Sequence, residues 1–211
     1  MISELIGGGW QHLPLQDADV LYAPSWLSRE EADELLARLL QEIPWERHRL
    51  NMFGREVDSP RLSCWIGDSG ATYVYSRSRF EPKSWTASLL ALRERVECSC
   101  QARFNSVLAN LYRDGQDSMG WHSDDEPELG AQPVIASVSL GADRRFRFRR
   151  RVPRGTPAAH PVNITLAHGS LLCMAGDTQR RYQHDLPKSA GLLAPRINLT
   201  FRLIDTAHHL P

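Results

Sequence analysis

A chain of 211 residues with 42% hydrophobic content is long enough for one compact domain with a full core, and too short for two. The formal net charge is zero, so overall charge does not indicate a nucleic-acid partner, and any such partner must be attracted by local patches. The four cysteines lack the paired spacing of a zinc site and the density of a secreted disulfide scaffold, and no apolar run approaches the ~20 residues of a membrane span. We therefore expect a soluble monomer of the cytoplasm, or of the nucleus in a eukaryote.

Two helices are expected in the first hundred residues. Ser28 and Glu31 form a capping box, apolar residues follow at helical spacing as far as Ile43, and Pro44 ends the helix. A second apolar stripe predicts a helix over residues 84–98. Both stripes are typical of packing surfaces. The sequence between the two helices is turn-rich and predicts loops or hairpins.

Short strands are expected from Asn105 onward, where apolar or alternating runs are separated by turn residues. The runs cover residues 105–112, 134–140, 144–149, 162–166, 170–174 and 196–204. Many short strands after two helices predict an α+β, mainly β fold, with a double-stranded β-helix (jelly roll) core buttressed by the N-terminal helices.

A cluster of arginines lies within the strand predicted at 144–149 and the loop that follows it. The cluster consists of Arg144, Arg145, Arg147, Arg149, Arg150, Arg151 and Arg154. Clustered arginine is typical of a strand edge kept soluble by charge, and equally of contact with phosphate groups. Both interpretations are open at this point.

A possible metal site begins with His122 and Asp124. Residues two apart in an extended segment project from the same face, which is a chelating geometry, although such a pair also occurs by chance. His184, about sixty residues downstream, would complete a set of two imidazoles and one carboxylate. That set suits iron(II) in oxygen-activating enzymes, and zinc hydrolases use a similar one.

The last predicted strand carries a second polar constellation. Its alternation places Arg196, Asn198, Thr200 and Arg202 on one face, with apolar residues on the other. An edge strand with a face in water would show the same pattern. Alternatively, the two guanidinium groups bind a dicarboxylate and interact with the groups around a metal. Asn110 and Tyr112 are a second polar pair on one face of their strand, able to hydrogen-bond a carboxylate.

Together these motifs resemble the AlkB family of iron(II)- and 2-oxoglutarate-dependent nucleic-acid dealkylases. The matching segments are Phe104 to Asp114, Trp121 to Pro127, Ile135 to Gly141, His168 to Leu172, Tyr182 to His184 and Arg196 to Arg202. They occur in family order over roughly residues 50 to 204, and the eukaryotic DNA- and RNA-repair homologues resemble them most. The resemblance implies a single domain over 1–211, in which residues 1–100 form the helical buttress and nucleotide-recognition lid and 101–205 the jelly-roll core.

The resemblance also implies roles for individual residues. His122, Asp124 and His184 would bind Fe(II). Arg196 would pair with the distal carboxylate of 2-oxoglutarate, and Arg202 would interact with the end of 2-oxoglutarate near the metal. The cosubstrate pocket would be completed by Asn110, Tyr112, Asn198 and Thr200. Dioxygen would be the oxidant, and the reaction would restore N-alkylated bases such as N1-methyladenine and N3-methylcytosine.

Substrate contacts follow from the same resemblance. Tyr75 would stack on the cationic base, Tyr73 would be its hydrogen-bonding neighbour, and Asp125 would be the carboxylate near the base edge. Met52-Phe53-Gly54 resembles a finger that wedges into duplex DNA. Each feature has a structural alternative: Tyr75 in the core, Asp125 in solvent or behind the metal ligands, and Phe53 as an anchor of its loop.

Two other functions fit the same residues. One is a sister dioxygenase that hydroxylates RNA, a protein or another substrate. The other is a binding module without catalysis that retains the jelly-roll shell, which the complete set of predicted metal and arginine positions disfavours.

Overall fold

The residues described by the computed structural model are 9–205, except 53, 54, 76, 77, 154, 158, 159 and 192. In strands at 49–52, 55–57, 73–75 and 78–80 the description covers the backbone alone. None of the described helices is long and apolar enough to cross a membrane.

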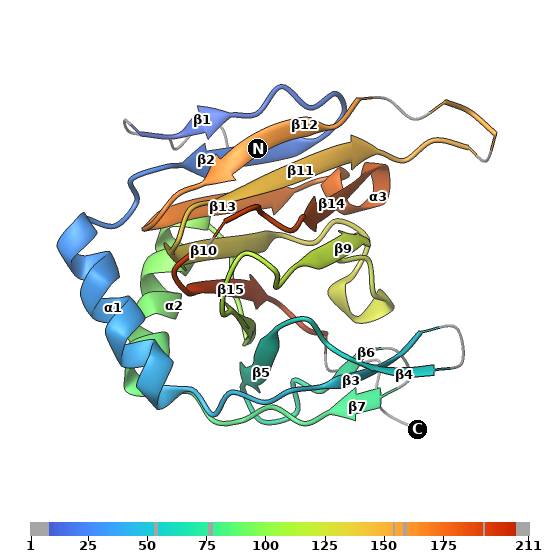
Figure 1. Cartoon of the computed structure of the whole chain (residues 1–211). Coiled ribbons are helices and arrows are strands. Elements are labelled where there is room, and N and C mark those ends of the chain that lie inside the picture. The colour runs from blue at the N-terminus through green and yellow to red at the C-terminus, as the bar shows by residue number, and fades with distance from the viewer. Residues whose placement is uncertain are drawn as a thin grey trace.

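Two antiparallel sheets face each other and form the centre of the molecule (Figure 1). The large sheet has the order β1-β2-β13-β10-β15-β8-β5 and the small sheet the order β12-β11-β14-β9. The large sheet contains β1 (Gln11–His12), β2 (Asp19–Ala23), β5 (Leu62–Gly67), β8 (Ser106–Tyr112), β10 (Ile135–Gly141), β13 (Ser170–Ala175) and β15 (Arg196–Arg202). The small sheet contains β9 (Met119–His122), β11 (Arg144–Arg150), β12 (Val162–Leu166) and β14 (Tyr182–Leu186). This arrangement confirms the predicted jelly-roll core.

Two hairpins extend from one end of the sheets, in the turn-rich stretch between the predicted helices. They are β3 (Arg49–Met52) with β4 (Arg55–Asp58), and β6 (Tyr73–Tyr75) with β7 (Ser78–Phe80). A 3-10 turn, η2 (Pro127–Leu129), and a short helix, α3 (Thr178–Arg181), complete the described elements.

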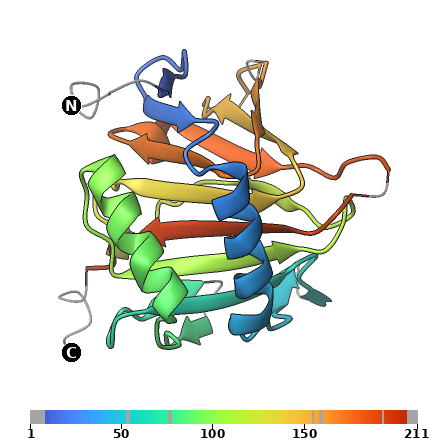
Figure 2. The ribbon, with the colours of Figure 1, turned by 90° about the vertical axis from the view of Figure 1, so that its left-hand side faces the viewer.

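Two long helices cover the outer face of the large sheet (Figure 2). Helix α1 (Arg29–Glu42) begins at the predicted capping box, in which the Ser28 hydroxyl accepts from the Glu31 amide and the Glu31 carboxylate accepts from the Ser28 amide. Helix α2 (Ala87–Cys100) is capped by Thr86, so it begins three residues later than predicted. The helices therefore buttress the sheet, as expected.

Alternation along the central strands divides the core into two layers. Val138 of β10 and Leu199 and Phe201 of β15 face the helices in the outer layer. The layer between the sheets contains Phe146 and Phe148 of β11 together with aliphatic and aromatic residues of the large sheet. Burying such side chains contributes about 1.5–3 kcal/mol each, so the two layers hold the sheets and helices together.

Strand β15 is central and fully buried, which shows that an edge strand with a face in water was the wrong alternative. It pairs with β10 on one side and β8 on the other, and each of its seven residues is buried. Its polar face therefore lies between the two sheets. Gly141, opposite Arg196, has φ 92°, and a Cβ there would collide with the Pro195 carbonyl. Glycine at position 141 therefore lets the backbone of β10 approach the chain at Pro195, directly before Arg196, the first residue of this polar face.

Candidate metal centre and pocket

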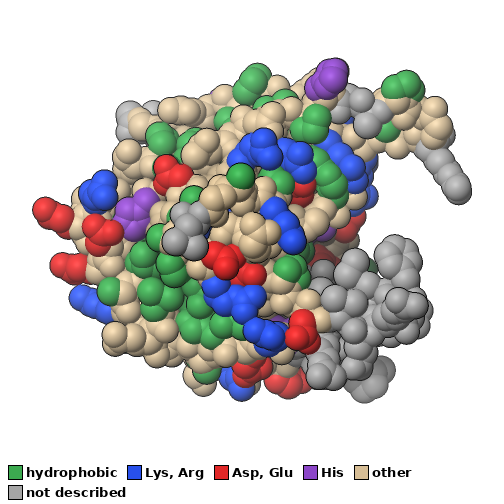
Figure 3. All heavy atoms as spheres, in the orientation of Figure 1, with side chains coloured by type: hydrophobic (Ala, Val, Ile, Leu, Met, Phe, Trp, Pro, Cys, Tyr) green, Lys and Arg blue, Asp and Glu red, His purple; other side chains and the backbone are tan. Residues whose placement is uncertain are grey.

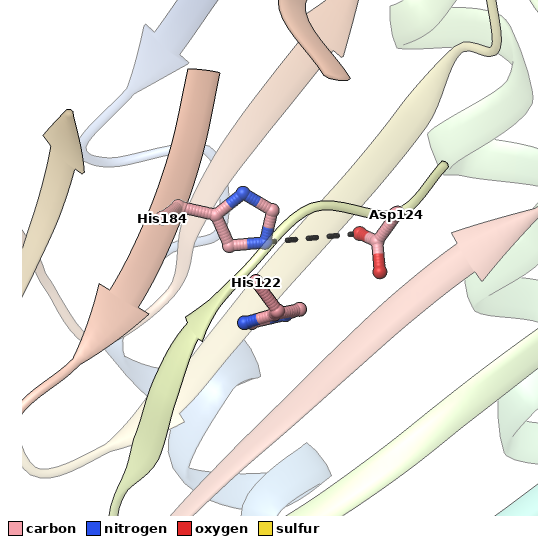
Figure 4. A group of neighbouring side chains, drawn as sticks. All are labelled: His122, Asp124 and His184. Carbon is pink, nitrogen blue, oxygen red and sulfur yellow. Dashed lines mark ion pairs between the residues drawn. The ribbon is translucent and has the colours of Figure 1, made fainter. Parts of the chain in front are cut away.

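Three predicted ligands point toward one another (Figure 4). His122 at the end of β9 is directly opposite His184 on the neighbouring strand β14, and Asp124 follows two residues after His122. One ligand atom from each residue lies within 4.8 Å of the others, and His184 Nε2 is 3.8 Å from Asp124 Oδ2. Strand pairing therefore brings together residues about sixty positions apart.

Both imidazole rings are held in fixed orientations. His122 Nδ1 lies 2.9 Å from the Gly120 carbonyl oxygen. Because a carbonyl only accepts, Nδ1 carries the proton there, and Nε2 keeps its lone pair for a metal. The His184 ring stacks on Phe146 with centroids 5.3 Å apart, and Phe148 packs edge-on at 6.2 Å. This packing limits rotation of the second imidazole.

The electrostatics of the cluster favour the protonation states that bind metals. Burial alone would raise the pKa of Asp124, but the Arg202 guanidinium and the two imidazoles outweigh it and hold the pKa at about 2. Burial lowers the pKa of His184 to about 3, and repulsion from His122 acts in the same direction. At neutral pH the cluster therefore presents an ionised carboxylate and a neutral His184 imidazole, which are the forms that coordinate metals.

The donor set fits an iron(II) centre. Two imidazoles and one carboxylate on one side of a metal leave positions open on the other side, as oxygen activation requires. Zinc accepts the same ligand types, so the ligands alone do not choose the metal.

A pocket between the sheets adjoins the three residues. Of the residues predicted for the cosubstrate, its lining includes Asn110, Tyr112, Asn198, Thr200 and Arg202. Further lining residues come from both sheets, including Ser137 of β10 and Met174 of β13 in the large sheet, and Phe146 of β11 in the small one. The pocket is therefore mainly polar along β8 and β15, and the small sheet opposite them contributes the two histidines together with apolar residues such as Phe146.

Arg196, the remaining predicted cosubstrate residue, is buried deep in the same layer, with 1% of its surface exposed. Its Nη2 donates to Ser139 Oγ at 2.9 Å and to Asn198 Oδ1 at 3.0 Å. Burial lowers the pKa of Arg196 to about 10, so it stays charged at neutral pH. Among the residues that the structure describes, its Nε and Nη1 have no hydrogen-bond partner. Such a group is suited to receive a carboxylate.

The predicted substrate contacts have different outcomes. Phe53 lies outside the described residues, and the side chains of Tyr73 and Tyr75 on β6 are not described either, so these three assignments stay predictions. Asp125 is half exposed and forms an ion pair with Arg151, with Oδ2 2.5 Å from Nη2. It is also absent from the described pocket lining.

The arginine cluster is not a strand edge, because β11 lies between β12 and β14. Lysine and arginine side chains gather over the small sheet in the upper part of the face in Figure 3. Most of those described are engaged within the molecule: Arg144 with backbone carbonyls, Arg147 with Asp185, Arg149 with Gln183, Arg150 with Asp17 and Arg151 with Asp125. Arg145 is exposed, and Arg154 lies outside the described residues. Arg147 and Arg149 thus join β11 to β14 within the small sheet, and Arg144, Arg150 and Arg151 join β11 and the residue after it to segments outside that sheet.

Several polar residues of the pocket were not predicted from the sequence, and Arg61 and Glu126 are the charged ones. Arg61 is buried and its Nε donates to Asn110 Oδ1 at 2.7 Å. Glu126 also lines the pocket, next to the predicted carboxylate Asp125. Arg61 stands in a turn-rich stretch after Pro60, where no periodicity marks a buried position.

Comparison with known proteins agrees with this geometry. The 2OG-Fe(II) oxygenase superfamily matches residues 19–202. The mouse (Mus musculus) protein "Alpha-ketoglutarate-dependent dioxygenase alkB homolog 3" is 41% identical over 186 residues, which cover 86% of this chain and 64% of that protein. The chain thus spans slightly less than two thirds of the length of that relative.

The human (Homo sapiens) "DNA oxidative demethylase ALKBH2" is 39% identical over 204 residues, covering 94% of this chain and 78% of that protein. A solved structure, "The structure of OsALKBH1", superposes with a TM-score of 0.64 at 17% identity, over 92% of this chain and 99% of that one, which supports the fold. Members of the matched superfamily use Fe(II), 2-oxoglutarate and dioxygen, for which the cluster and pocket described above are suited. The chain belongs to the 2OG-Fe(II) oxygenase superfamily and, within it, to the AlkB family.

Proposed function

We propose that this protein removes alkyl groups from damaged nucleobases in DNA, as an Fe(II)- and 2-oxoglutarate-dependent dioxygenase. The observation that carries the proposal is the meeting of His122, Asp124 and His184 beside a pocket lined with arginine and amide groups. The names of the relatives, an AlkB homologue and a DNA oxidative demethylase, supply the substrate class.

In this proposal His122, Asp124 and His184 hold the iron. The Arg202 guanidinium donates to Asp124 Oδ1 at 2.6 Å, so it fixes the carboxylate and leaves Oδ2 toward the metal side. This contact orients a ligand through a hydrogen bond, as outer-shell partners of metal sites do.

The cosubstrate would occupy the pocket between the sheets. Arg196 offers the unused N–H groups of Nε and Nη1 to the distal carboxylate, and Arg202 lies at the end near the metal. Asn110, Tyr112 and Thr200 line the space between them. Asn198 donates to Thr200 Oγ1 at 2.8 Å, so this polar row is ordered before a ligand arrives.

When bound, iron with 2-oxoglutarate and dioxygen supplies oxidative chemistry that yields succinate and carbon dioxide and hydroxylates the N-alkyl carbon. A hydroxymethyl group on nitrogen then leaves as formaldehyde and restores the base. The chain's own residues act by position and charge: they hold the reactants together and keep solvent from the reacting carbon.

For recognition of the damaged base, we propose the residues predicted from the sequence. Tyr75 would stack on a flipped base and Tyr73 would support it, while Phe53 would fill the gap left in a duplex. Asp125 would attract a cationic base, which requires that Arg151 release it first. DNA is favoured over RNA by the name of the human relative, a DNA oxidative demethylase, and RNA stays a second substrate to test.

A dioxygenase acting on another substrate is the main alternative. We propose further that the protein works inside the cell, which its four free cysteines support, and that it works as a monomer.

Demethylation of matched oligonucleotides tests the proposal. Single- and double-stranded DNA and RNA containing N1-methyladenine or N3-methylcytosine would be incubated with the protein, Fe(II) and 2-oxoglutarate, and product bases measured by mass spectrometry. We expect base restoration that requires 2-oxoglutarate and is lost in His122→Ala. Succinate formation with other substrates but none coupled to methylated oligonucleotides would identify the alternative dioxygenase.

A further inference from the structure

Two fully buried arginines contact the ring of one pocket tyrosine. Arg144 begins β11 of the small sheet, Arg196 begins β15 of the large sheet, and each is 1% exposed. The centres of their guanidinium groups lie 5.7 Å and 5.3 Å from the centroid of the Tyr112 ring. Tyr112 lines the pocket and is directly opposite Arg196 on the neighbouring strand. Two positive charges therefore converge at the deep end of the pocket.

Within the described residues, the hydrogen bonds of both arginines end on uncharged oxygens. Arg196 donates to a hydroxyl and an amide, and Arg144 donates to three backbone carbonyls. These acceptors are Ser139 Oγ and Asn198 Oδ1 for Arg196, and the carbonyls of Asp114, Asp117 and Pro187 for Arg144. The Asp117 carboxylate near Arg144 is itself held by Arg113 through two side-chain hydrogen bonds of 2.8 Å. Neither buried cation thus has a carboxylate hydrogen-bonded to it.

Donor capacity is left over at the same place. Arg196 Nε and Nη1 and Arg144 Nε have no hydrogen-bond partner in the described part of the chain. Burying unneutralised charges is costly, and the cost falls when an anion enters. The deep end of the pocket is therefore arranged for a negatively charged group.

We propose that Arg144 is a second cation of the subsite for the distal carboxylate of 2-oxoglutarate. It acts across Tyr112 on a ligand that Arg196 contacts directly. Both terminal nitrogens of Arg144 are already bonded to backbone carbonyls, so it is a positioning residue: its charge attracts the carboxylate, and its contact with Tyr112 orients that ring. The inference rests on the proposed function, because it assumes that Arg196 receives this carboxylate.

A purely structural role for Arg144 predicts different behaviour. Its hydrogen bonds join the segment at residues 114–117 to Pro187, so its loss could simply loosen that end of the molecule. In that case every ligand of the pocket would be affected alike. An electrostatic role distinguishes ligands by whether they carry the distal charge.

The test compares two ligands that differ in that charge. Calorimetry with the Mn(II)-loaded protein would measure binding of 2-oxoglutarate and of 2-oxopentanoate, which has the same five-carbon chain but no distal carboxylate. The variants are Arg144→Met, Arg144→Lys and, as matched control, Arg145→Met, which removes the exposed arginine next along the same strand.

We expect Arg144→Met to weaken binding of 2-oxoglutarate by about tenfold, and that of 2-oxopentanoate by less than about twofold. Arg144→Lys should keep most of the preference because it keeps the charge, and Arg145→Met should resemble the wild type. Equal losses for both ligands in Arg144→Met, or no loss for either, would overturn the proposal. The same selective loss in Arg145→Met would also overturn it, because the effect would then not be specific to Arg144. If the wild-type protein itself failed to prefer 2-oxoglutarate, the cosubstrate assignment of the proposed function would be wrong instead.

Discussion

Arg202 and Asp124 join the two sheets at the candidate metal site, with Nη2 of the arginine 2.6 Å from Oδ1 of the carboxylate. Arg202 ends β15, an inner strand of the large sheet, and Asp124 follows β9 of the small sheet. Both side chains are at least 95% buried, so this ion pair is shielded from solvent. It couples the proposed iron ligand to the strand that carries the cosubstrate residues.

Replacing Arg202 should therefore weaken metal binding. In Arg202→Met, Asp124 loses its fixed orientation and the charge that keeps its pKa low, so affinity for Mn(II) or Co(II) should fall about 10- to 100-fold. Calorimetric titration of the apoprotein measures this metal affinity. Arg103→Met, which replaces an exposed arginine, is the control. Unchanged affinity in Arg202→Met would mean that the ion pair serves only the fold.

Arg61 and Asn110 should act as one unit. The 2.7 Å hydrogen bond fixes the amide in the pocket, and both residues are buried. Each single variant, Arg61→Met and Asn110→Ala, should lower the free energy of unfolding, and a double-mutant cycle should give a coupling of about 1–3 kcal/mol. Urea unfolding provides the four values. Additive effects would show that the two side chains are energetically independent.

The Arg151–Asp125 ion pair makes a prediction about charged bases. Arg151→Met should free the Asp125 carboxylate and tighten binding of an oligonucleotide containing cationic N1-methyladenine by about threefold to tenfold. Binding of the same oligonucleotide with uncharged N3-methylthymine should not tighten. Fluorescence anisotropy with the Mn(II) protein measures both without turnover.

Asp125→Asn is the companion variant, and it should remove the preference for the cationic base. If Arg151→Met weakened binding of both oligonucleotides equally, Arg151 would instead be a phosphate contact. That result would restore the interpretation of the arginine cluster as a nucleic-acid surface.

Asp117 should make stability depend on pH. Burial alone would raise the pKa of Asp117, but hydrogen bonds and charge from Arg113 outweigh it and keep the pKa below its usual value. A carboxyl with a depressed pKa in the folded state stabilises it above the unfolded pKa, and this contribution is lost as the pH falls through the folded pKa.

Asp117→Asn should therefore lower the free energy of unfolding by about 1–3 kcal/mol at pH 7. The difference from the wild type should shrink as the pH falls below about 4, the unfolded pKa of an aspartate. Urea unfolding of both proteins from pH 7 to below about pH 4 measures this difference in the free energy of unfolding. A difference that stays constant with pH would mean that the ionised carboxylate is not the stabilising form.

Elements with strong local signals were predicted well. The capping box at Ser28 located the start of α1. The predicted runs located six strands whose ends all lie within two residues of the prediction: β8, β10, β11, β12, β13 and β15. The ligand set was also found, because His122 and Asp124 are neighbours and the motifs flanking His184 occur in family order. Each of these signals is contained in a short segment of the chain.

The remaining features depend on distant pairing. Strand β9, Met119–His122, contains a glycine and few strand-forming residues, and its pairing with β14 defines it. Strands β2 and β5 were not predicted, although both belong to the large sheet. The partners of Arg61, Arg144 and Arg151 come from other strands and loops, so no local pattern revealed which arginines are buried.

Stoichiometry of the reaction tests the central claim most directly. With a limiting amount of an N1-methyladenine oligonucleotide, succinate and restored adenine would be quantified together for the wild-type protein and for His184→Ala. We predict one succinate per restored base in the wild type, and neither product in the variant. Restored base without succinate, or undiminished turnover in His184→Ala, would contradict the account.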